Sequence, residues 1–387
     1  MIVADHATIL IIHGITEIGG AERELLTILE RLPARGYAPC VVLSGNGPLV
    51  EELARRDVPT RSAPFPPWRK LAAYPRRASA VRRLRALLSE LNPTLVHVND
   101  IWWVPQTLRA RAGSPGSTVP LVAHVRQGIE PRKVRPYELA KADLVLAVSH
   151  WVERSLQEGG VSPERIETIH SGLDLGKIRD RGDPVQVRNG LGIPPDATLL
   201  GTVANPFPIK GYDVMLRALP AILRACPRCH YVIVGRGDAA YERALRKLSE
   251  RLGVDGHVHF TGFREEVNPI LAALDVYVHP SRMESFGISL IEAMAMGRAV
   301  VATRTGGIPE IVVEGETGVL VPPEDPEALA VAVCALLGDT PRRRTFGEAG
   351  RRRVNDHFTV EVMMERMTRA YTQLLECRRP ARVTGPV

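Results

Sequence analysis

The sequence predicts an α/β protein made of two doubly wound halves, each built on a mainly parallel sheet, with a cleft between them. Three observations lead to this fold class. Short apolar runs of strand length alternate with helix-forming stretches along the whole chain. The length of 387 residues suits two or three domains. The stretch 176–184 collects charged residues, Gly and Pro, as a linker between domains does.

The strand-like runs fall into two sets, one on each side of that linker. The first set occupies residues 8–12, 39–43, 94–98, 119–124 and 144–148. The second set lies near 198–203, 231–234, 257–260, 275–279, 299–302 and 318–321. Helical stretches lie between successive runs, as two doubly wound halves require.

Composition narrows the class of protein. A hydrophobic content of 45% with 24% charged residues is ordinary for a globular protein. No apolar run approaches the ~18 residues that a membrane-spanning helix needs. The run 8–12 is short and no Lys or Arg precedes it, so we interpret it as a first strand and not a signal peptide. We therefore expect a cytoplasmic protein, or one bound peripherally to the inner face of the cell membrane.

The most informative stretch runs from Pro280 to Gly297. Glu284 lies in a turn of small residues, and Glu292 follows eight positions later in an apolar, helix-forming run. Gly287 between them lets a backbone come close to a ligand, and the first N–H groups of a helix can hold a phosphate. Strand-like runs on both sides make this a βαβ unit with its loops at the ligand-binding edge. Two such carboxylates often simply face water, but here the combination suits a nucleotide sugar.

At these residues the chain resembles the retaining glycosyltransferases of family 4, which have the GT-B fold. The family's Glu-x7-Glu motif matches Glu284 and Glu292, and its phosphate-binding Lys matches Lys210 before Gly211. Three longer segments also match: Gly19-Gly20-Ala21-Glu22-Arg23, GGIPEIV from 306, and ETGVLVPPEDPEALA from 316. The resemblance covers about residues 8 to 375 and is most specific between 200 and 330.

The resemblance implies a domain plan. Residues 1–178 would form the acceptor-side Rossmann-like domain, and 179–357 the domain that binds the nucleotide-sugar donor. Residues 358–377 would form a helix that crosses back to the first domain. We expect 378–387 to be a disordered tail.

The resemblance also implies roles for residues of the donor site. Glu284 would bind sugar hydroxyls, Glu292 the ribose hydroxyls, and Lys210 would neutralise the diphosphate leaving group. The other donor contacts would come from glycines, from backbone N–H groups and from a loop that cradles the base: Gly19, Gly20, Phe263, Arg264, Ser285, Phe286, Gly287 and Ile288.

The chain departs from the family pattern before Lys210. The family usually has an Arg five residues earlier, where this chain has Asn205. An Asn can donate a hydrogen bond but supplies no positive charge. Arg282, or an Arg of the first domain, could compensate.

Two residues at and just after the end of the strand-like run 119–124 are further catalytic candidates. His124 and Arg126 follow the apolar residues 121–123, where family members often have a His that contacts the donor sugar. The register leaves open which of the two takes that place, and we expect both to line the cleft. The alternative for His124 is a buried histidine of the core.

No Asp-x-Asp occurs in the sequence, and many sugar-nucleotide enzymes hold a divalent metal with that motif. We therefore expect no metal and no cofactor, with Lys210 and helix N-termini carrying the charge instead. Cys226-Pro-Arg-Cys229-His230 matches a haem-attachment pattern, but with no export signal we interpret both cysteines as structural thiols.

The net charge of +7 is unevenly distributed, because residues 58–89 contain no Asp or Glu. The aromatic and basic residues expected to contact a membrane or an acceptor are Trp68, Arg69, Lys70, Arg76, Arg77, Arg82 and Arg83. They could meet an anionic lipid surface, where each basic residue contributes about 1 kcal/mol. The alternative is a surface helix with an apolar stripe inside and a solvated basic face outside. Nucleic acid is not expected, since no recognition motif accompanies the charge.

These features together predict a retaining, metal-independent glycosyltransferase. It would move a sugar from a UDP-sugar, or else a GDP-sugar, to a hydroxyl of a glycan or lipid-linked saccharide in cell-envelope or polysaccharide synthesis. Three alternatives stay open: a hydrolase with a carboxylate pair, a sugar-nucleotide epimerase of the same fold, and a non-catalytic nucleotide-sugar binding protein.

Overall fold

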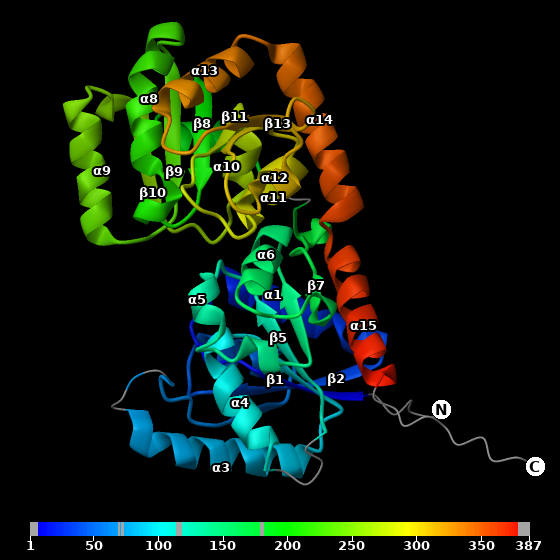
Figure 1. Cartoon of the computed structure of the whole chain (residues 1–387). Helices are drawn as coiled ribbons and strands as arrows, with labels where there is room; N and C mark the ends of the chain where they lie inside the picture. Colours follow the sequence, from blue (N-terminus) through cyan, green and yellow to red (C-terminus); the bar gives the residue numbers. More distant parts are fainter. Residues whose placement is uncertain (1–6, 69, 71–72, 114–117, 179–181, 378–387) are drawn as a thin grey trace, which may run out of the picture. The chain divides into compact units, whose positions relative to one another are not determined.

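The computed structural model describes residues 7–68, 70, 73–113, 118–178 and 182–377, which fold into two compact units (Figure 1). Unit 1 comprises the described residues of Met1–Gly172 and Glu361–Val387, and unit 2 those of Leu173–Val360. The domain limits expected from the sequence, 178/179 and 357/358, lie a few residues from these boundaries. The expected tail at 378–387 lies outside the described residues.

The sheet of unit 1 is parallel, with the strand order β3-β2-β1-β4-β5-β6-β7. Its strands are β1 (Ala7–Ile12), β2 (Tyr37–Leu43), β3 (Thr60–Ser62), β4 (Leu95–Val98), β5 (Leu121–Val125), β6 (Leu144–Ala147) and β7 (Ile166–Thr168). The sequence analysis missed β3 and β7. Both are three-residue edge strands without a fully buried side chain, so no apolar run marks them.

The helices of unit 1 are α1 (Gly20–Arg31), α2 (Pro48–Arg55), α3 (Tyr74–Leu91), α4 (Val104–Arg111), α5 (Pro131–Val134) and α6 (His150–Glu158). The C-terminal helix α15 (Val360–Glu376) joins them from residue 361 onward. Its Tyr371 is buried, and the hydroxyl lies 2.7 Å from His97 Nδ1 on β4. The Tyr371 ring also packs edge-on against Tyr37, with 5.8 Å between centroids, so a polar and an aromatic contact hold this last helix within unit 1.

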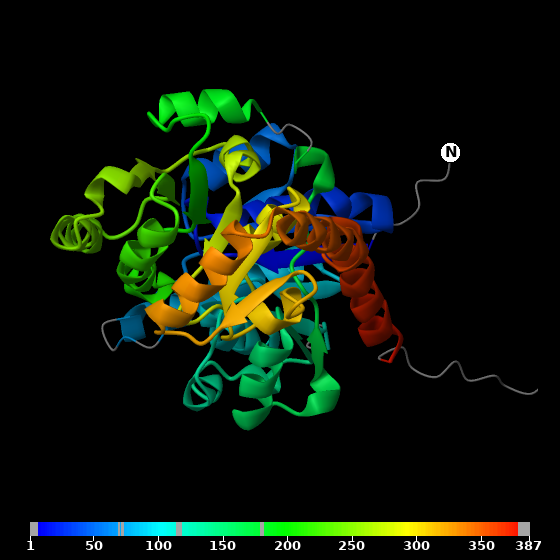
Figure 2. The same cartoon turned by 90° about the horizontal axis from the view of Figure 1, so that it is seen from above.

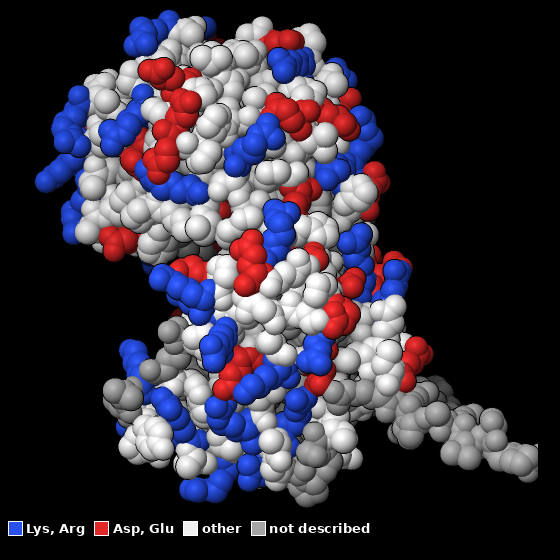
Figure 3. Space-filling view, viewed as in Figure 1, with Lys and Arg blue, Asp and Glu red and all other residues white. Residues whose placement is uncertain are grey.

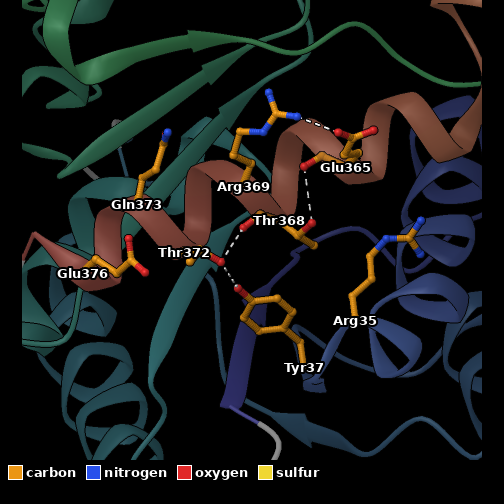
Figure 4. A pocket seen from close by; sticks show the side chains of 8 residues that line it. All are labelled: Arg35, Tyr37, Glu365, Thr368, Arg369, Thr372, Gln373 and Glu376. Atoms are coloured by element: carbon orange, nitrogen blue, oxygen red, sulfur yellow. Dashed lines mark hydrogen bonds and ion pairs between the residues drawn. The ribbon is translucent and has the colours of Figure 1, made fainter.

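A groove of about 520 Å³ lies between α15 and the residues at the start of β2 (Figure 4). Its lining residues are Arg35, Tyr37, Glu365, Thr368, Arg369, Thr372, Gln373 and Glu376. The Tyr37 hydroxyl lies 3.1 Å from Thr372 Oγ1, and Glu365 forms an ion pair with Arg369. None of the residues predicted to form the functional site lines this groove.

The sheet of unit 2 is also parallel, with the order β10-β9-β8-β11-β12-β13. Its strands are β8 (Thr198–Val203), β9 (Cys229–Val234), β10 (Val258–Gly262), β11 (Val276–His279), β12 (Ala299–Thr303) and β13 (Gly318–Val321). All six match predicted runs. Strands β11 and β12 are buried along their whole length, as strands covered on both faces are.

The helices of unit 2 are α7 (Pro184–Gly190), α8 (Tyr212–Ala225), α9 (Ala239–Arg251), α10 (Asn268–Ala273), α11 (Ile288–Ala295), α12 (Ile308–Ile311), α13 (Pro326–Leu337) and α14 (Thr340–His357). Helices α8 and α13 pack side by side, and α13 lies across the sheet, orange over yellow in Figure 2. Their apolar faces form the main core cluster with the strands, for example through Leu219, Val278 and Val333. The predicted α/β class is therefore confirmed.

Each sheet has one point at which the strand order reverses, between β1 and β4 in unit 1 and between β8 and β11 in unit 2. Loops that leave neighbouring strands there diverge to opposite faces, which opens a crevice for ligands at the carboxyl ends. The site residues that follow β8 and β11 should therefore lie close together. Among the described residues, no helix is both long and apolar enough to cross a membrane.

Candidate active site

The connection from β11 to α11 places Glu284 at the carboxyl edge of the unit 2 sheet. Gly287 precedes the helix with φ of +122°, a backbone conformation that favours glycine, and α11 begins at the next residue. The Glu284 side chain is only 14% exposed. Its Oε2 lies 2.6 Å from Lys210 Nζ and 3.1 Å from His279 Nε2. The predicted pair of Lys210 and Glu284 is thus brought together.

Behind Glu284 lies a polar network that the sequence analysis missed. His279 is buried, and its Nε2 also lies 3.2 Å from Ser281 Oγ. On the other side, His279 Nδ1 lies 3.2 Å from the Tyr277 hydroxyl, which donates to Ser289 Oγ at 2.9 Å. The signal was present in the sequence, because Tyr277 and His279 alternate in a strand and therefore share one face.

The charges around Glu284 hold it ionised. Burial alone would raise the pKa of this carboxyl, but the hydrogen bond and charge of His279 and the ammonium of Lys210 lower the pKa to about 2. At neutral pH the group therefore accepts hydrogen bonds and does not deliver a proton. This suits a residue that orients hydroxyl groups.

Two glycines allow the loops to come this close. Gly211 follows Lys210 with φ of +67°, and a Cβ there would lie 1.9 Å from the Pro280 carbonyl oxygen. Gly306 has φ of +55°, and a Cβ there would lie 1.8 Å from the Glu284 carbonyl oxygen. The same carbonyl accepts the Gly307 N–H at 2.9 Å. Any side chain at either glycine would push the Glu284 segment away.

Asn205 contacts the backbone of the segment that follows β9. Its Oδ1 accepts the backbone N–H of Arg236 at 3.3 Å. The guanidinium of Arg282 is fully engaged by Asp213, Glu324 and the Pro208 carbonyl, through Nε, Nη1 and Nη2. Each of its five N–H groups has an acceptor among these contacts, so the suggestion that Arg282 compensates is not supported.

The other donor-site candidates of unit 2 lie at the same edge of the sheet. Phe263 and Arg264 follow β10 and are exposed, with Phe263 53% accessible. Glu292 lies within α11 and is half-buried, as is Ser285, while Ile288 opens the helix.

Phe286 differs from these neighbours, because its ring is buried against Phe358 with 5.7 Å between centroids. Its side chain is therefore a core contact.

In unit 1, the expected loop residues open helix α1. Gly19 is the N-cap, and its N–H donates to Glu22 Oε2 at 2.9 Å, while Gly20 is exposed. Arg126 is only 10% exposed and donates to the Ala21 carbonyl at 2.8 Å. Arg126 therefore holds the start of α1.

His124 lies on β5 inside unit 1. It is buried, its ring packs edge-on against His97, and its Nδ1 has no hydrogen-bond partner among the described residues. Burial, together with the nearby charge of Arg126, lowers the pKa of His124 well below its ordinary value, so the ring is neutral. This matches the alternative of a core histidine.

The basic segment forms a surface groove of about 650 Å³ next to α3 and α4, lined by Trp68, Tyr74, Arg77, Ala78, Val81, Arg85, Arg109 and Ala112. Arg77 lies over the Trp68 and Tyr74 rings, and Arg109 also lies over the Trp68 ring. Figure 3 shows Lys and Arg side chains gathered over these two helices.

The two sides of α3 are clearly divided. The leucines of its apolar stripe, Leu84, Leu87 and Leu88, are buried in unit 1. The basic side chains Lys70, Arg76, Arg82 and Arg83 face solvent, and Arg69 lies outside the described residues. The apolar stripe is thus used for packing, and only the basic and aromatic face is available to a partner.

Two family models match the chain. "Glycosyltransferase Family 4" matches residues 18–177, and "Glycosyl transferases group 1" matches residues 194–339. Between them they cover most of both units and leave the linker unmatched.

Curated relatives point the same way. The chain is 37% identical over 251 residues to a D-inositol 3-phosphate glycosyltransferase of Thermomonospora curvata, covering 60% of this chain and 57% of that protein. It is 34% identical over 253 residues to the GDP-mannose-dependent alpha-(1-6)-phosphatidylinositol monomannoside mannosyltransferase of Mycolicibacterium smegmatis, covering 62% and 64%. The chain spans about half the length of the curated relatives it matches.

Solved structures share the fold at lower identity. Anabaena Alr3699/HepE in complex with UDP and glucose has a TM-score of 0.81 at 24% identity, covering 95% of this chain and all of that one. Sucrose-phosphate synthase from Thermosynechococcus elongatus has a TM-score of 0.79 at 23% identity, covering 96% and 100%. With two parallel Rossmann-like sheets and matches to both halves, the chain has the GT-B fold and belongs to glycosyltransferase family 4, the glycosyl transferases group 1.

Proposed function

We propose that this chain is a retaining, metal-independent glycosyltransferase that moves a sugar from a nucleotide-sugar donor to a hydroxyl acceptor. One observation carries the proposal: Glu284 lies at the carboxyl edge of the unit 2 sheet, held ionised by Lys210 and His279. An ionised carboxylate accepts hydrogen bonds from sugar hydroxyls, and an adjacent ammonium suits a diphosphate. A general acid would need the proton that this carboxyl lacks at neutral pH.

The donor would lie along the loops that follow β8, β10 and β11. Lys210 and the backbone N–H groups of 285–288 would meet the diphosphate, because a helix N-terminus favours negative charge. Glu292 would hold the ribose hydroxyls, and Phe263 with Arg264 would meet the base. Lys210 is paired with Glu284, so its ammonium would either turn toward the diphosphate or be shared between the carboxylate and the diphosphate.

The transfer step would break the bond between the anomeric carbon and the diphosphate oxygen. A new bond forms from the acceptor oxygen to the anomeric carbon on the same face of the sugar. The acceptor proton passes to the departing phosphate oxygen. Lys210 and the amides of α11 stabilise the negative charge that develops on that diphosphate. No protein nucleophile is needed in this step, and Glu284 serves to orient the sugar.

A UDP-sugar is the favoured donor and a GDP-sugar the second choice. One relative is named as GDP-mannose-dependent, and one structural neighbour holds UDP and glucose. The acceptor would be a glycan or lipid-linked saccharide in cell-envelope or polysaccharide synthesis. Relatives are named for acceptors that carry phosphate, an inositol phosphate and a phosphatidylinositol mannoside. The basic groove beside α3 suits such an anionic acceptor, or an anionic membrane at the cytoplasmic face.

The test combines a donor screen with a stereochemical readout. Thermal shifts with UDP-, GDP- and ADP-linked sugars identify the donor, since ligand at a hundred times its dissociation constant stabilises by ~2.7 kcal/mol. Proton NMR of the product formed with phosphorylated polyol and glycan acceptors then reports the anomeric configuration. We expect the donor's configuration to be kept, with full turnover in excess chelator.

Four outcomes contradict the proposal. Inverted product overturns the retaining mechanism, and activity that returns only with Mg²⁺ or Mn²⁺ overturns metal independence. Conversion of donor to an epimer without acceptor identifies an epimerase. Tight donor binding with no turnover on any acceptor identifies a non-catalytic nucleotide-sugar binding protein.

A further inference from the structure

The loop that follows β1 is held at both ends by carboxylates. It runs over residues 14–19: the Gly14 N–H donates to Asp100 Oδ2 at 3.2 Å, and the Gly19 N–H donates to Glu22 Oε2 at 2.9 Å. Between these ends Ile15 is 43% and Ile18 is 36% exposed, while Ser44 Oγ donates to the Gly14 carbonyl at 2.6 Å and the Leu49 N–H donates to the Thr16 carbonyl at 2.9 Å. The two end contacts therefore fix the path of the loop together with these two hydrogen bonds.

A single buried imidazole lies between the two carboxylates. His13 is fully buried, with Nδ1 3.0 Å from Asp100 Oδ2. Its Nε2 lies 3.3 Å from Glu22 Oε1, an ion-pair contact without hydrogen-bond geometry. Asp100 follows β4 and Glu22 belongs to the first turn of α1, so His13 ties the ends of three elements together. An imidazole donates from both nitrogens only when it is protonated.

The charges that face His13 come from each of the surrounding elements. Asp100 and Glu22 are negative, and Arg126 beyond β5 is positive, with Glu24 3.5 Å from its guanidinium. Burial lowers the pKa of His13, but the bonds to Asp100 and Glu22 outweigh it and raise the pKa above 6.5. Burial likewise opposes ionisation of Glu22 and Asp100, yet the contact with His13 lowers the pKa of both.

The neutral amide Asn99 completes the surroundings of His13. Its Nδ2 lies 2.9 Å from His13 Nδ1, and its Oδ1 is buried without a partner among the described residues. Side-chain amide orientation follows from the hydrogen-bond network, and the reverse orientation would offer Oδ1 to a protonated Nδ1. Asn99 can therefore hydrogen-bond to His13 whether the imidazole is neutral or protonated. Only the contacts with the two carboxylates favour the protonated form.

We propose that His13 is a positioning residue that, when protonated, clamps the loop 14–19 through Asp100 and Glu22. Loss of that proton leaves one donor for two carboxylates, which loosens the loop and limits turnover at alkaline pH. The link to turnover rests on the proposed function and on the family resemblance, which implies that Gly19 and Gly20 are donor contacts. The clamp itself can be measured without any substrate.

A second buried histidine of unit 1 gives a matched control. His97 lies on β4, next to β1, with Nδ1 2.7 Å from the Tyr371 hydroxyl. No carboxylate contacts its ring among the described residues, and burial, together with Arg126, lowers its pKa to about 3. His97 is therefore neutral throughout the pH range in which His13 loses its proton.

The first experiment measures the clamp by histidine NMR titration and by hydrogen exchange of the peptide that covers 14–20. We expect His13 to titrate above 6.5 in the full chain, and at lower pH in Glu22→Gln, which keeps an acceptor for Gly19 but removes the charge. At pH 7 we expect several-fold faster loop exchange in His13→Gln, and wild-type exchange in His97→Gln. Titration of His13 at or below 6.5, or equal loop exchange in His13→Gln and wild type, overturns the clamp. If His13→Gln does not fold, Glu22→Gln provides the exchange comparison.

The second experiment follows kcat/KM from pH 5.5 to 9.5 with the donor identified in the screen. The alkaline limb should move to lower pH in Glu22→Gln by the shift that NMR gives for His13, and should stay in place in His97→Gln. If the alkaline limb of kcat/KM does not shift with the pKa of His13, the link between the clamp and turnover is overturned. The clamp itself is then still supported by the NMR and exchange results. Absence of turnover with every donor refutes the proposed function, and the NMR and exchange results still decide the clamp.

Discussion

Lys210 Nζ lies 2.6 Å from Glu284 Oε2, although 74 positions separate the two residues. The pair joins the loop after β8 to the loop after β11, across the point at which the strand order of unit 2 reverses. A third group, His279 Nε2, shares the same carboxylate oxygen at 3.1 Å. The positive charge of Lys210 thus lies beside the carboxylate that would orient the donor sugar.

The first prediction concerns Lys210. In Lys210→Ala the positive charge that would meet the diphosphate is lost, and removal of one preorganised donor of this kind costs ~2.7–4 kcal/mol, or roughly 10²–10³ in rate. Steady-state kinetics with the identified donor measures the loss. Lys247→Ala removes an exposed lysine on α9 as a control and should keep wild-type rates. Equal rates in Lys210→Ala and wild type would place the diphosphate elsewhere.

The second prediction concerns pH and stability at Glu284. Its pKa is lowered to about 2 from an ordinary 4.5, so its stabilising contribution is complete above pH 4.5 and is lost as pH falls toward 2. The shift corresponds to roughly 3 kcal/mol. Between pH 6 and pH 3 the melting temperature of wild type should therefore fall more than that of Glu284→Gln.

Glu250→Gln is the matched control for this measurement, because Glu250 is an exposed residue of α9. Its melting temperature should follow wild type at every pH. Parallel curves for wild type and Glu284→Gln would mean that Lys210 and His279 do not hold the carboxylate ionised.

The sequence predicted the sheets well because most of their strands are buried and apolar. Strands such as β11 and β12 read as continuous runs of Val, Ala and Tyr. The edge strands β3 and β7 were not predicted, because their exposed residues follow no apolar pattern. Edge position alone does not explain this, because the edge strands β10 and β13 of unit 2 match predicted runs.

The sequence predicted individual residues of the site, but it did not predict which of them contact one another. Motif spacing located Lys210 and Glu284, whereas His279 looked like one more residue of a buried strand. The engagement of Arg282 could not be foreseen, since its partners Asp213 and Glu324 lie far away in the sequence on both sides. Pairing of this kind depends on which loops the sheet order brings together, and a single sequence shows that only indirectly.

The third prediction tests the missing charge at position 205. Asn205 is exposed and its side chain accepts one backbone N–H, so Asn205→Arg adds a guanidinium at the loss of a single neutral contact. A hydrogen bond to a charged group contributes ~1.5–3 kcal/mol, so nucleoside diphosphate should bind roughly tenfold more tightly or better. Isothermal titration calorimetry measures this. Weaker binding would show that another group already occupies the space.

The fourth prediction concerns Glu292 and the ribose. Glu292→Ala should weaken UDP binding by roughly tenfold or more, because a carboxylate acceptor for the hydroxyls is lost. The melting temperature should stay near that of wild type, since the side chain is half-buried at most. Dideoxy-UDP, which lacks both ribose hydroxyls, should bind wild type and Glu292→Ala equally. A loss of the same size with both nucleotides would assign Glu292 to another contact.

The last prediction concerns the basic face of α3. The purified chain should bind vesicles that contain phosphatidylglycerol and release them as salt rises, because the Debye length falls from ~10 Å at 0.1 M to ~3 Å at 1 M. Reversal of Arg76, Arg77, Arg82 and Arg83 to Glu should abolish binding, since each basic residue near an anionic surface contributes about 1 kcal/mol. Vesicle co-sedimentation measures this binding.

The matched control reverses four exposed basic residues of unit 2: Arg224, Arg243, Lys247 and Arg251. This variant changes the net charge equally and should leave binding intact. Equal loss in both variants would indicate a response to net charge alone, and equal wild-type binding to neutral vesicles would indicate an apolar anchor.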